Sequence, residues 1–167
     1  AQVLSNVENT YMSDSELNNE DPMLQHINAD DPLQIVVRGH LYVEAALNKL
    51  ICFKLSIPKA IDLSDLRYPL KVALAVALGV LPQVDSGSLL ALNKLRNRLA
   101  HNIGYQVKPK DVKELLGTLS PMMRVPYKKF LKRKPSLNTD HLEQLRSYIV
   151  LLEIMLNQLL KLYSSAK

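Results

Sequence analysis

The sequence places an arginine and a histidine, Arg96 and His101, near the end of a predicted helix with four residues between them. Leucines at three- and four-residue spacing predict that residues 86–105 are helical. At about 100° per residue, Arg96 lies within about 40° of Leu92, on the apolar side of that helix. A guanidinium keeps its charge, so an arginine on this side needs a carboxylate, a phosphate or a water-filled cleft. Histidine is the side chain that exchanges a proton near neutral pH. The pair therefore indicates anion binding or acid–base chemistry on a phosphate.

Asn97 follows Arg96 directly and precedes His101 by one helical turn. From this position its amide could orient the imidazole ring of His101 or donate a hydrogen bond to a bound phosphate. Arg96, Asn97 and His101 are therefore the first candidate site residues.

A second helix is predicted over residues 33–56, before Pro58, and it carries polar side chains within its apolar face. Its expected buried residues recur at helical spacing and are Leu33, Val37, Leu41, Leu47, Ile51 and Leu55. His40, Glu44 and Asn48 fall within the same arc, each one turn from the next. A buried glutamate is rare unless it is paired, so this face needs a cation opposite it.

Two helices that each turn a charge of opposite sign inward are expected to meet through those charges. We therefore expect Glu44 to pair with Arg96 or with His101. Such a pair has two interpretations, which the sequence leaves open. It is either a structural ion pair that orients the two helices, or part of a catalytic site.

The remaining segments predict an all-α protein, an up-and-down bundle of four to five helices with short links. A helix that begins near Pro69 is apolar almost all round, which predicts a central position. A short helix is expected from Pro109 to about Leu119, an irregular connector over residues 120–138, and a final helix from a Thr139 cap to about Tyr163. We divide the chain into an acidic flexible arm, residues 1–32, and a single helical domain, residues 33–167.

Charge is distributed unevenly along the chain. Residues 1–31 contain seven of the 16 acidic residues and no Lys or Arg, so all 21 Lys and Arg fall in residues 32–167. A body this basic suits a polyanion such as RNA, although ordinary solubility charge gives the same balance. Six basic residues of the expected connector are candidate RNA-binding residues: Arg124, Lys128, Lys129, Lys132, Arg133 and Lys134. Tyr127 and Phe130 lie among them and would either stack on bases or pack beneath a solvated loop.

The cysteine and histidine content and the lengths of the apolar runs argue against several classes of protein. The single cysteine, Cys52, excludes an internal disulfide and a multi-cysteine zinc site, and the four histidines occur at no metal-ligand spacing. We therefore expect no metal and no cofactor. No apolar run reaches the ~18 residues of a membrane span and no signal-peptide pattern opens the chain, so we expect a cytoplasmic protein without a membrane partner.

The Arg-x4-His sequence at Arg96 and His101, with Asn directly after the Arg, resembles the motif of HEPN-domain proteins. Two further segments are similar to the mannitol operon repressor-like branch of that superfamily: VRGHLYVE at residues 37–44, and YPLKVALAVALGVLP leading into LNKLRNRLAHN at residues 68–102. The resemblance covers about residues 33–119. Where some toxin members carry an aromatic residue two positions after the His, this chain has Ile103, and Tyr105 lies two residues further on.

The resemblance implies a homodimer in which two copies of the motif line one cleft. Many members are metal-independent endoribonucleases, often toxins or defence effectors, and others bind nucleotides or proteins without cleavage. As an enzyme, the protein would use His101 as general base on an RNA 2′-hydroxyl and Arg96 to hold the phosphate oxygens, leaving a cyclic phosphate end. Asn97 would orient the ring and Glu44 would fix Arg96.

Four further residues are candidate supporting residues of that site: Arg38, His40, Asn48 and Tyr105.

The alternative is a non-catalytic regulator or interaction module similar to the mannitol operon repressor, which would bind a regulator protein or an antitoxin. In that interpretation the same polar residues set the dimer register. Direct DNA binding is a weaker alternative, because no helix-turn-helix pattern with a basic recognition helix is present.

Overall fold

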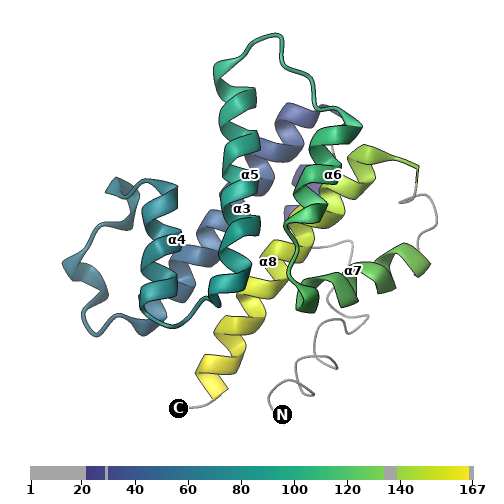
Figure 1. Ribbon diagram of the computed structural model, residues 1–167. Helices are drawn as coiled ribbons and strands as arrows, with labels where there is room; N and C mark the ends of the chain where they lie inside the picture. The colour runs from purple at the N-terminus through teal and green to yellow at the C-terminus, as the bar shows by residue number, and fades with distance from the viewer. Residues whose placement is uncertain (1–21, 29, 134–138, 166–167) are drawn as a thin grey trace.

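Two long helices, α3 (Pro32–Lys54) and α8 (His141–Ser165), pack against each other along the middle of the molecule (Figure 1). The computed structural model describes residues 22–28, 30–133 and 139–165. Within these residues the secondary structure is entirely helical. The predicted all-α bundle is therefore confirmed, with more helices than the four to five expected.

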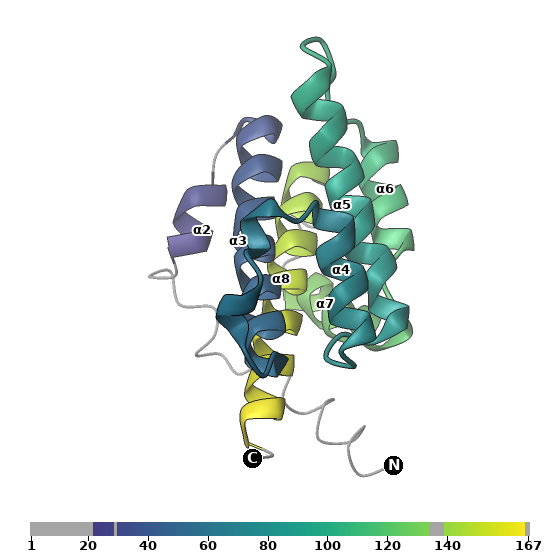
Figure 2. The same cartoon turned by 90° about the vertical axis from the view of Figure 1, so that its left-hand side faces the viewer.

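The shorter helices cover this central pair on different sides (Figures 1 and 2). α2 packs on α3; α4 packs on α3 and α5; α5 packs on α3; and α6 and α7 pack on α8. Their bounds are α2 Pro22–Ile27, α4 Tyr68–Ala77, α5 Gln83–His101, α6 Pro109–Gly117 and α7 Pro121–Arg133. Two 3-10 turns, Pro58–Ala60 and Leu63–Asp65, connect α3 to α4.

The buried face of α3 is rotated from the predicted stripe. Leu47 is buried as expected, but Leu33 and Leu41 are 42% and 57% exposed. The face toward α8 includes Gly39, where a Cβ atom would lie 2.6 Å from Cγ2 of the buried Ile149. The two helices therefore approach closely at a residue without a side chain, which apolar periodicity does not reveal.

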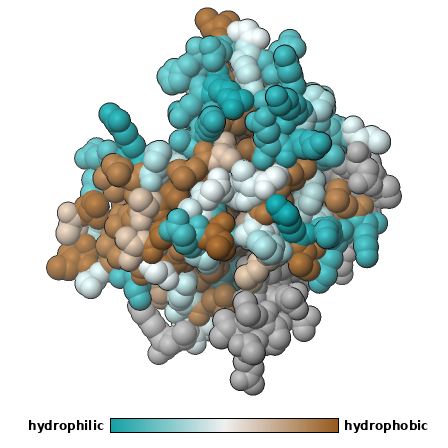
Figure 3. All heavy atoms as spheres, viewed as in Figure 1, coloured by the Kyte–Doolittle hydropathy of each residue, from teal (hydrophilic) through white to brown (hydrophobic). Residues whose placement is uncertain are grey.

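α4 lies at one side of the bundle, so the predicted central position is wrong. Leu70 on its outer face is 56% exposed, and hydrophobic surface gathers over this part of the molecule (Figure 3). α8 takes the central place instead. α5, by contrast, buries the four leucines of its predicted stripe, Leu89, Leu92, Leu95 and Leu99, although it begins at Gln83 rather than Ser86.

The predicted irregular connector is wrong for residues 121–133, which form α7. The hydroxyl of Ser120 accepts a hydrogen bond from the backbone N–H of Met123 at 3.3 Å, as a capping residue does. Pro126 lies inside the helix, where it removes one backbone donor, and Met123 and Tyr127 are buried one turn apart. Burial of this face against α8 explains why the helix continues through the proline.

The ends of two predicted segments also differ from expectation. Asp140, rather than Thr139, caps α8 by accepting from the backbone N–H of Leu142 at 2.8 Å. Part of the expected acidic arm forms α2, whose Met23 and Ile27 are buried. The helical domain therefore begins before residue 33, and residues 1–21 lie outside the described residues. No described helix combines the length and apolar character that a membrane crossing requires.

Candidate functional site

A buried ion pair joins α3 to α4 at Glu44, one of the predicted site residues. Nζ of Lys71 donates to Oε1 of Glu44 at 2.5 Å, and the Lys71 side chain is 3% exposed. Oε2 of Glu44 lies 3.7 Å from Nδ1 of His40, one turn earlier on α3. Glu44 is therefore paired as predicted, but the expected partners, Arg96 and His101, are wrong.

The reason lies in α4, whose lysine is the first residue of an otherwise apolar run. An ammonium buried to this extent requires a carboxylate, and Glu44 is the one that α3 presents to α4. The ion pair thus fixes the position of α4 against α3. This contact favours the structural interpretation of Glu44.

His40 is buried beside this ion pair and packs against Tyr68. The two ring centroids are 4.4 Å apart and the ring planes are inclined at 45°. Burial lowers the pKa of His40; Glu44 opposes this shift, and the positive charge of Arg96 adds to it. Burial also raises the pKa of the Tyr68 hydroxyl. His40 is therefore neutral at physiological pH and unsuited to hold a charge.

Three buried polar atoms near this cluster have no hydrogen-bond partner among the described residues. They are Nε2 of His40, the hydroxyl of Tyr68 and Oδ1 of Asn48. Asn48 therefore lies on the inner side of α3 with His40, as the sequence predicted. Buried polar atoms are usually paired, and ordered water is the common partner where no protein atom is near.

Arg96 is half-buried on α5 and lies close enough to His40 for its charge to lower the pKa of that ring. Its Nη1 donates to Oδ1 of Asn97 at 3.0 Å. Among the described residues, no carboxylate forms an ion pair with Arg96, since Glu44 is held by Lys71. A guanidinium has five N–H donors, so most of the hydrogen-bonding capacity of Arg96 is available to an anion.

His101 is the last residue of α5 and is exposed. The structure does not bring it together with Arg96 within one chain. Five residues along a helix correspond to a rotation of about 140° and a rise of about 7.5 Å, so the two side chains leave α5 in different directions. Asn97 lies between them, in contact with Arg96 and one turn before His101.

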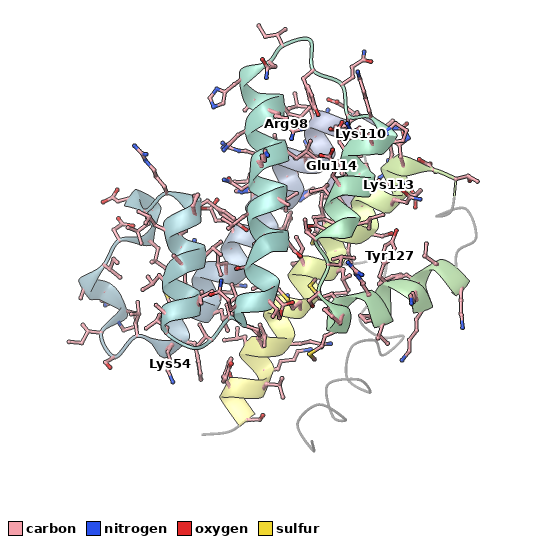
Figure 4. All side chains as sticks on the ribbon, in the orientation of Figure 1. Lys54, Arg98, Lys110, Lys113, Glu114 and Tyr127 are labelled. Carbon is pink, nitrogen blue, oxygen red and sulfur yellow. The ribbon has the colours of Figure 1, made fainter. Side chains whose placement is uncertain are left out.

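Arg98 forms a network that the sequence did not suggest, because its position predicts a solvated face. Its Nη1 donates to Oδ1 of Asp111 and to the hydroxyl of Tyr105, each at 3.1 Å. The side chain points from α5 toward α6 (Figure 4). Tyr105 therefore supports the loop after α5 rather than contacting Arg96. Tyr105 and Asp111 follow Arg98 by 7 and 13 residues, beyond the end of α5, so helical spacing does not signal these contacts.

The other predicted residues fall outside this cluster. Arg38 is exposed, and its Nη1 donates to the backbone oxygen of His26 at 3.3 Å, which ties α2 to α3. Arg124 donates to the backbone oxygens of Leu119 and Gly117 at 2.9 and 3.1 Å and so stabilises the end of α6. Both arginines are therefore used structurally.

The rest of the predicted RNA-binding run lies on α7. Lys128, Lys129 and Lys132 are exposed, whereas the side chain of Arg133 and the whole of Lys134 lie outside the described residues. Tyr127 is 8% exposed and points from α7 into the bundle (Figure 4), so the alternative in which it stacks on bases is wrong. Phe130 is half-buried.

Comparisons with family models, with curated proteins and with solved structures find no match. The chemistry of the site therefore has to be argued from its own side chains. Within the described ranges, no three His, Cys, Asp or Glu side chains are grouped as a metal ion would require. The site offers a guanidinium free to bind an anion, an amide beside it and an exposed imidazole five residues away.

Proposed function

We propose that the protein is a metal-independent endoribonuclease of the HEPN type, in which Arg96 and His101 act on one RNA phosphodiester. The observation that carries this proposal is the state of Arg96. Its guanidinium is half-buried, has the Asn97 amide as a hydrogen-bond partner, and forms no ion pair with a described carboxylate. Such a group is suited to a phosphate, which a guanidinium can bind through two parallel hydrogen bonds.

The proposed reaction is an internal transfer of the phosphoryl group. The imidazole of His101 takes the proton from a ribose 2′-hydroxyl, and the 2′-oxygen attacks the adjacent phosphorus. The bond from phosphorus to the 5′-oxygen of the next nucleotide breaks, which leaves a 2′,3′-cyclic phosphate. The departing 5′-oxygen takes a proton from water and becomes a hydroxyl, and the imidazolium of His101 returns its proton to the hydroxide that this leaves. Arg96 stabilises the charge that builds on the non-bridging oxygens. Asn97 holds Arg96 through its amide oxygen.

A single copy of α5 cannot supply both groups to one phosphate, because Arg96 and His101 diverge by about 140° around the helix. The proposal therefore includes a homodimer in which Arg96 of one copy faces His101 of the other. The C-terminal end of α5 projects from the bundle, where a second copy could reach it (Figures 1 and 2). Ile103, just beyond this end, is fully exposed and offers an apolar contact for that copy.

Cleavage of RNA in the presence of EDTA tests the proposal. The wild-type protein should produce fragments with cyclic phosphate ends, and His101→Ala should lower the rate by roughly 10²–10⁴-fold, the range for loss of a general base. His141→Ala, at the start of α8, is the matched control and should retain the wild-type rate. Absence of cleavage, or cleavage that His101→Ala leaves unchanged, would refute the proposal.

A non-catalytic interaction module is the second candidate, and the buried pair of Glu44 and Lys71 favours it. In that case the polar residues between α3, α4 and α5 serve to hold the helices in register, and Arg96 belongs to the same structural cluster. This alternative predicts that Arg96→Ala lowers the melting temperature. The nuclease proposal predicts little change, because among the described residues the side chain of Arg96 donates its one hydrogen bond to its sequence neighbour.

A further inference from the structure

The outer face of α7 is basic and carries no acidic residue. The helix contains five Lys and Arg residues and no Asp or Glu over residues 121–133. Its buried face includes Met123 and Tyr127. Lys128, Lys129 and Lys132 fall within an arc of about 100° on the opposite side, and all three are exposed. We call these three residues the α7 lysine face.

Among the residues that the structure describes, these lysines form no contact that stabilises the fold. Among the described residues none of them takes part in an ion pair, in contrast to Lys71, Arg98 and Arg146, which each pair with a carboxylate. Arg124, at the edge of the same arc, is occupied by the backbone oxygens at the end of α6. Three lysines thus share one exposed face of α7, and a polyanion bound there would relieve the repulsion between their charges.

We propose that the α7 lysine face binds the sugar-phosphate backbone of RNA at a distance from the cleaved bond. This inference rests on the proposed function for the identity of the polyanion. The contacts are to phosphates alone, because Tyr127 is buried and Phe130 half-buried, so α7 presents no exposed aromatic ring on which bases could stack. Binding at this face is therefore independent of sequence and strongly dependent on salt.

The position of α7 determines which RNA can use both sites. The C-terminal end of α5 is at the top of the molecule in both views, whereas α7 lies in the lower half (Figures 1 and 2). A dinucleotide bound at Arg96 and His101 cannot reach the lysines, whereas a strand of many nucleotides can. The α7 lysine face should accordingly increase the affinity for long RNA without changing the chemistry at α5.

The test measures the salt dependence of binding to an uncleavable 2′-O-methyl RNA of about 20 nucleotides. The variant is Lys128→Gln/Lys129→Gln/Lys132→Gln. The matched control removes the same charge from exposed lysines at the end of α3 and the turn after it, Lys49→Gln/Lys54→Gln/Lys59→Gln; Lys54 points away from α7 in Figure 4. All six residues are exposed, so both variants should fold with wild-type circular dichroism.

Each phosphate neutralised on a single strand contributes about 0.7 to the slope of log affinity against log salt, so three lysines contribute about 2. The slope of the α7 variant should be smaller by this amount. The ratio of wild-type affinity to variant affinity should therefore fall about 20-fold as the salt rises from 50 to 200 mM. The α3 control should keep the wild-type slope. Cleavage of a dinucleotide should be equal in wild type and the α7 variant, while kcat/KM for the long RNA should fall.

The outcomes separate this inference from the proposed function. If wild type binds and cleaves RNA but the α7 variant keeps the full salt slope, or the control loses as much, the inference is overturned and the cleavage proposal stands. If the α7 variant also loses dinucleotide cleavage, the lysines act at the α5 site and a separate binding face is overturned. If wild type neither binds nor cleaves RNA, both are overturned.

Discussion

Replacing Lys71 with methionine leaves the carboxylate of Glu44 without its ammonium partner. Nζ of Lys71 lies 2.5 Å from Oε1 of Glu44, and the side chains of Lys71 and Glu44 are 3% and 24% exposed. Methionine has a similar length and no charge, so Lys71→Met keeps the packing of α4 while it removes the ion pair. We expect this single change to destabilise the protein clearly.

The magnitude follows from the burial of the pair. Removing one partner of a fully buried ion pair costs about 3–5 kcal/mol, because the remaining charge is uncompensated. Glu44 keeps some contact with water, which stabilises the orphaned carboxylate, so we expect about 2–3 kcal/mol here. For a domain of this size each kcal/mol lowers the melting temperature by about 2–4 °C, which gives a decrease of roughly 4–12 °C.

Thermal and urea unfolding, followed by circular dichroism, measure this loss, and a double-mutant cycle assigns it to the pair. Lys71→Met, Glu44→Gln and the double variant should show a coupling of about 1–3 kcal/mol, since the double variant leaves no unpaired charge. Lys49→Met, an exposed lysine on α3, is the matched control and should change stability by less than about 0.5 kcal/mol. The reasoning would be refuted if Lys71→Met lowered the free energy of unfolding by no more than this control does. It would also be refuted if the losses of the two single variants added up to the loss of the double variant.

The remaining predictions concern two glycines and His40. Gly39→Ala should destabilise the protein by about 1–2 kcal/mol, because its Cβ would meet Ile149, whereas Gly87→Ala, inside α5 with open space around it, should stabilise it by about 0.5–1 kcal/mol; urea unfolding checks both. Because the pKa of His40 is lowered in the folded protein, the unfolded chain binds a proton on this ring at a higher pH than the folded chain does. The contribution of the neutral ring to the free energy of unfolding is therefore complete above about pH 6.5, the ordinary pKa of histidine, and is lost as the pH falls below it. His40→Gln should therefore show a smaller decrease in melting temperature between pH 7.5 and pH 5 than wild type, and an equal decrease would contradict the assignment.

The sequence predicted the long helices because their apolar residues repeat over several turns. Leu89, Leu92, Leu95 and Leu99 of α5 are buried as their spacing indicates. The rotation of α3 was not predictable, because it depends on the close approach of α8 at Gly39. α7 was missed because its proline and its basic residues are typical of a loop, while the decisive factor is burial of its other face against α8.

The candidate site was predictable only in part. Periodicity placed His40 and Glu44 on the inner side of α3, and the structure agrees. It could not choose the partner of Glu44, because pairing depends on how the helices are arranged in space, and Lys71 is the one charged residue of a run that is otherwise apolar. The divergence of Arg96 and His101, by contrast, follows from their spacing once both residues lie on one helix, as they do on α5.

Mixing two inactive variants decides whether a shared site exists between copies. Arg96→Ala and His101→Ala should each lower the rate of RNA cleavage in EDTA by at least about 100-fold when tested alone. After the two proteins are unfolded together and refolded as a mixture, half of the dimers contain one copy of each, and one of the two sites in such a dimer has both residues, so about a quarter of the wild-type activity should return. A mixture that stays as inactive as its components, although wild type cleaves RNA after the same treatment, would contradict a site built from Arg96 of one copy and His101 of the other.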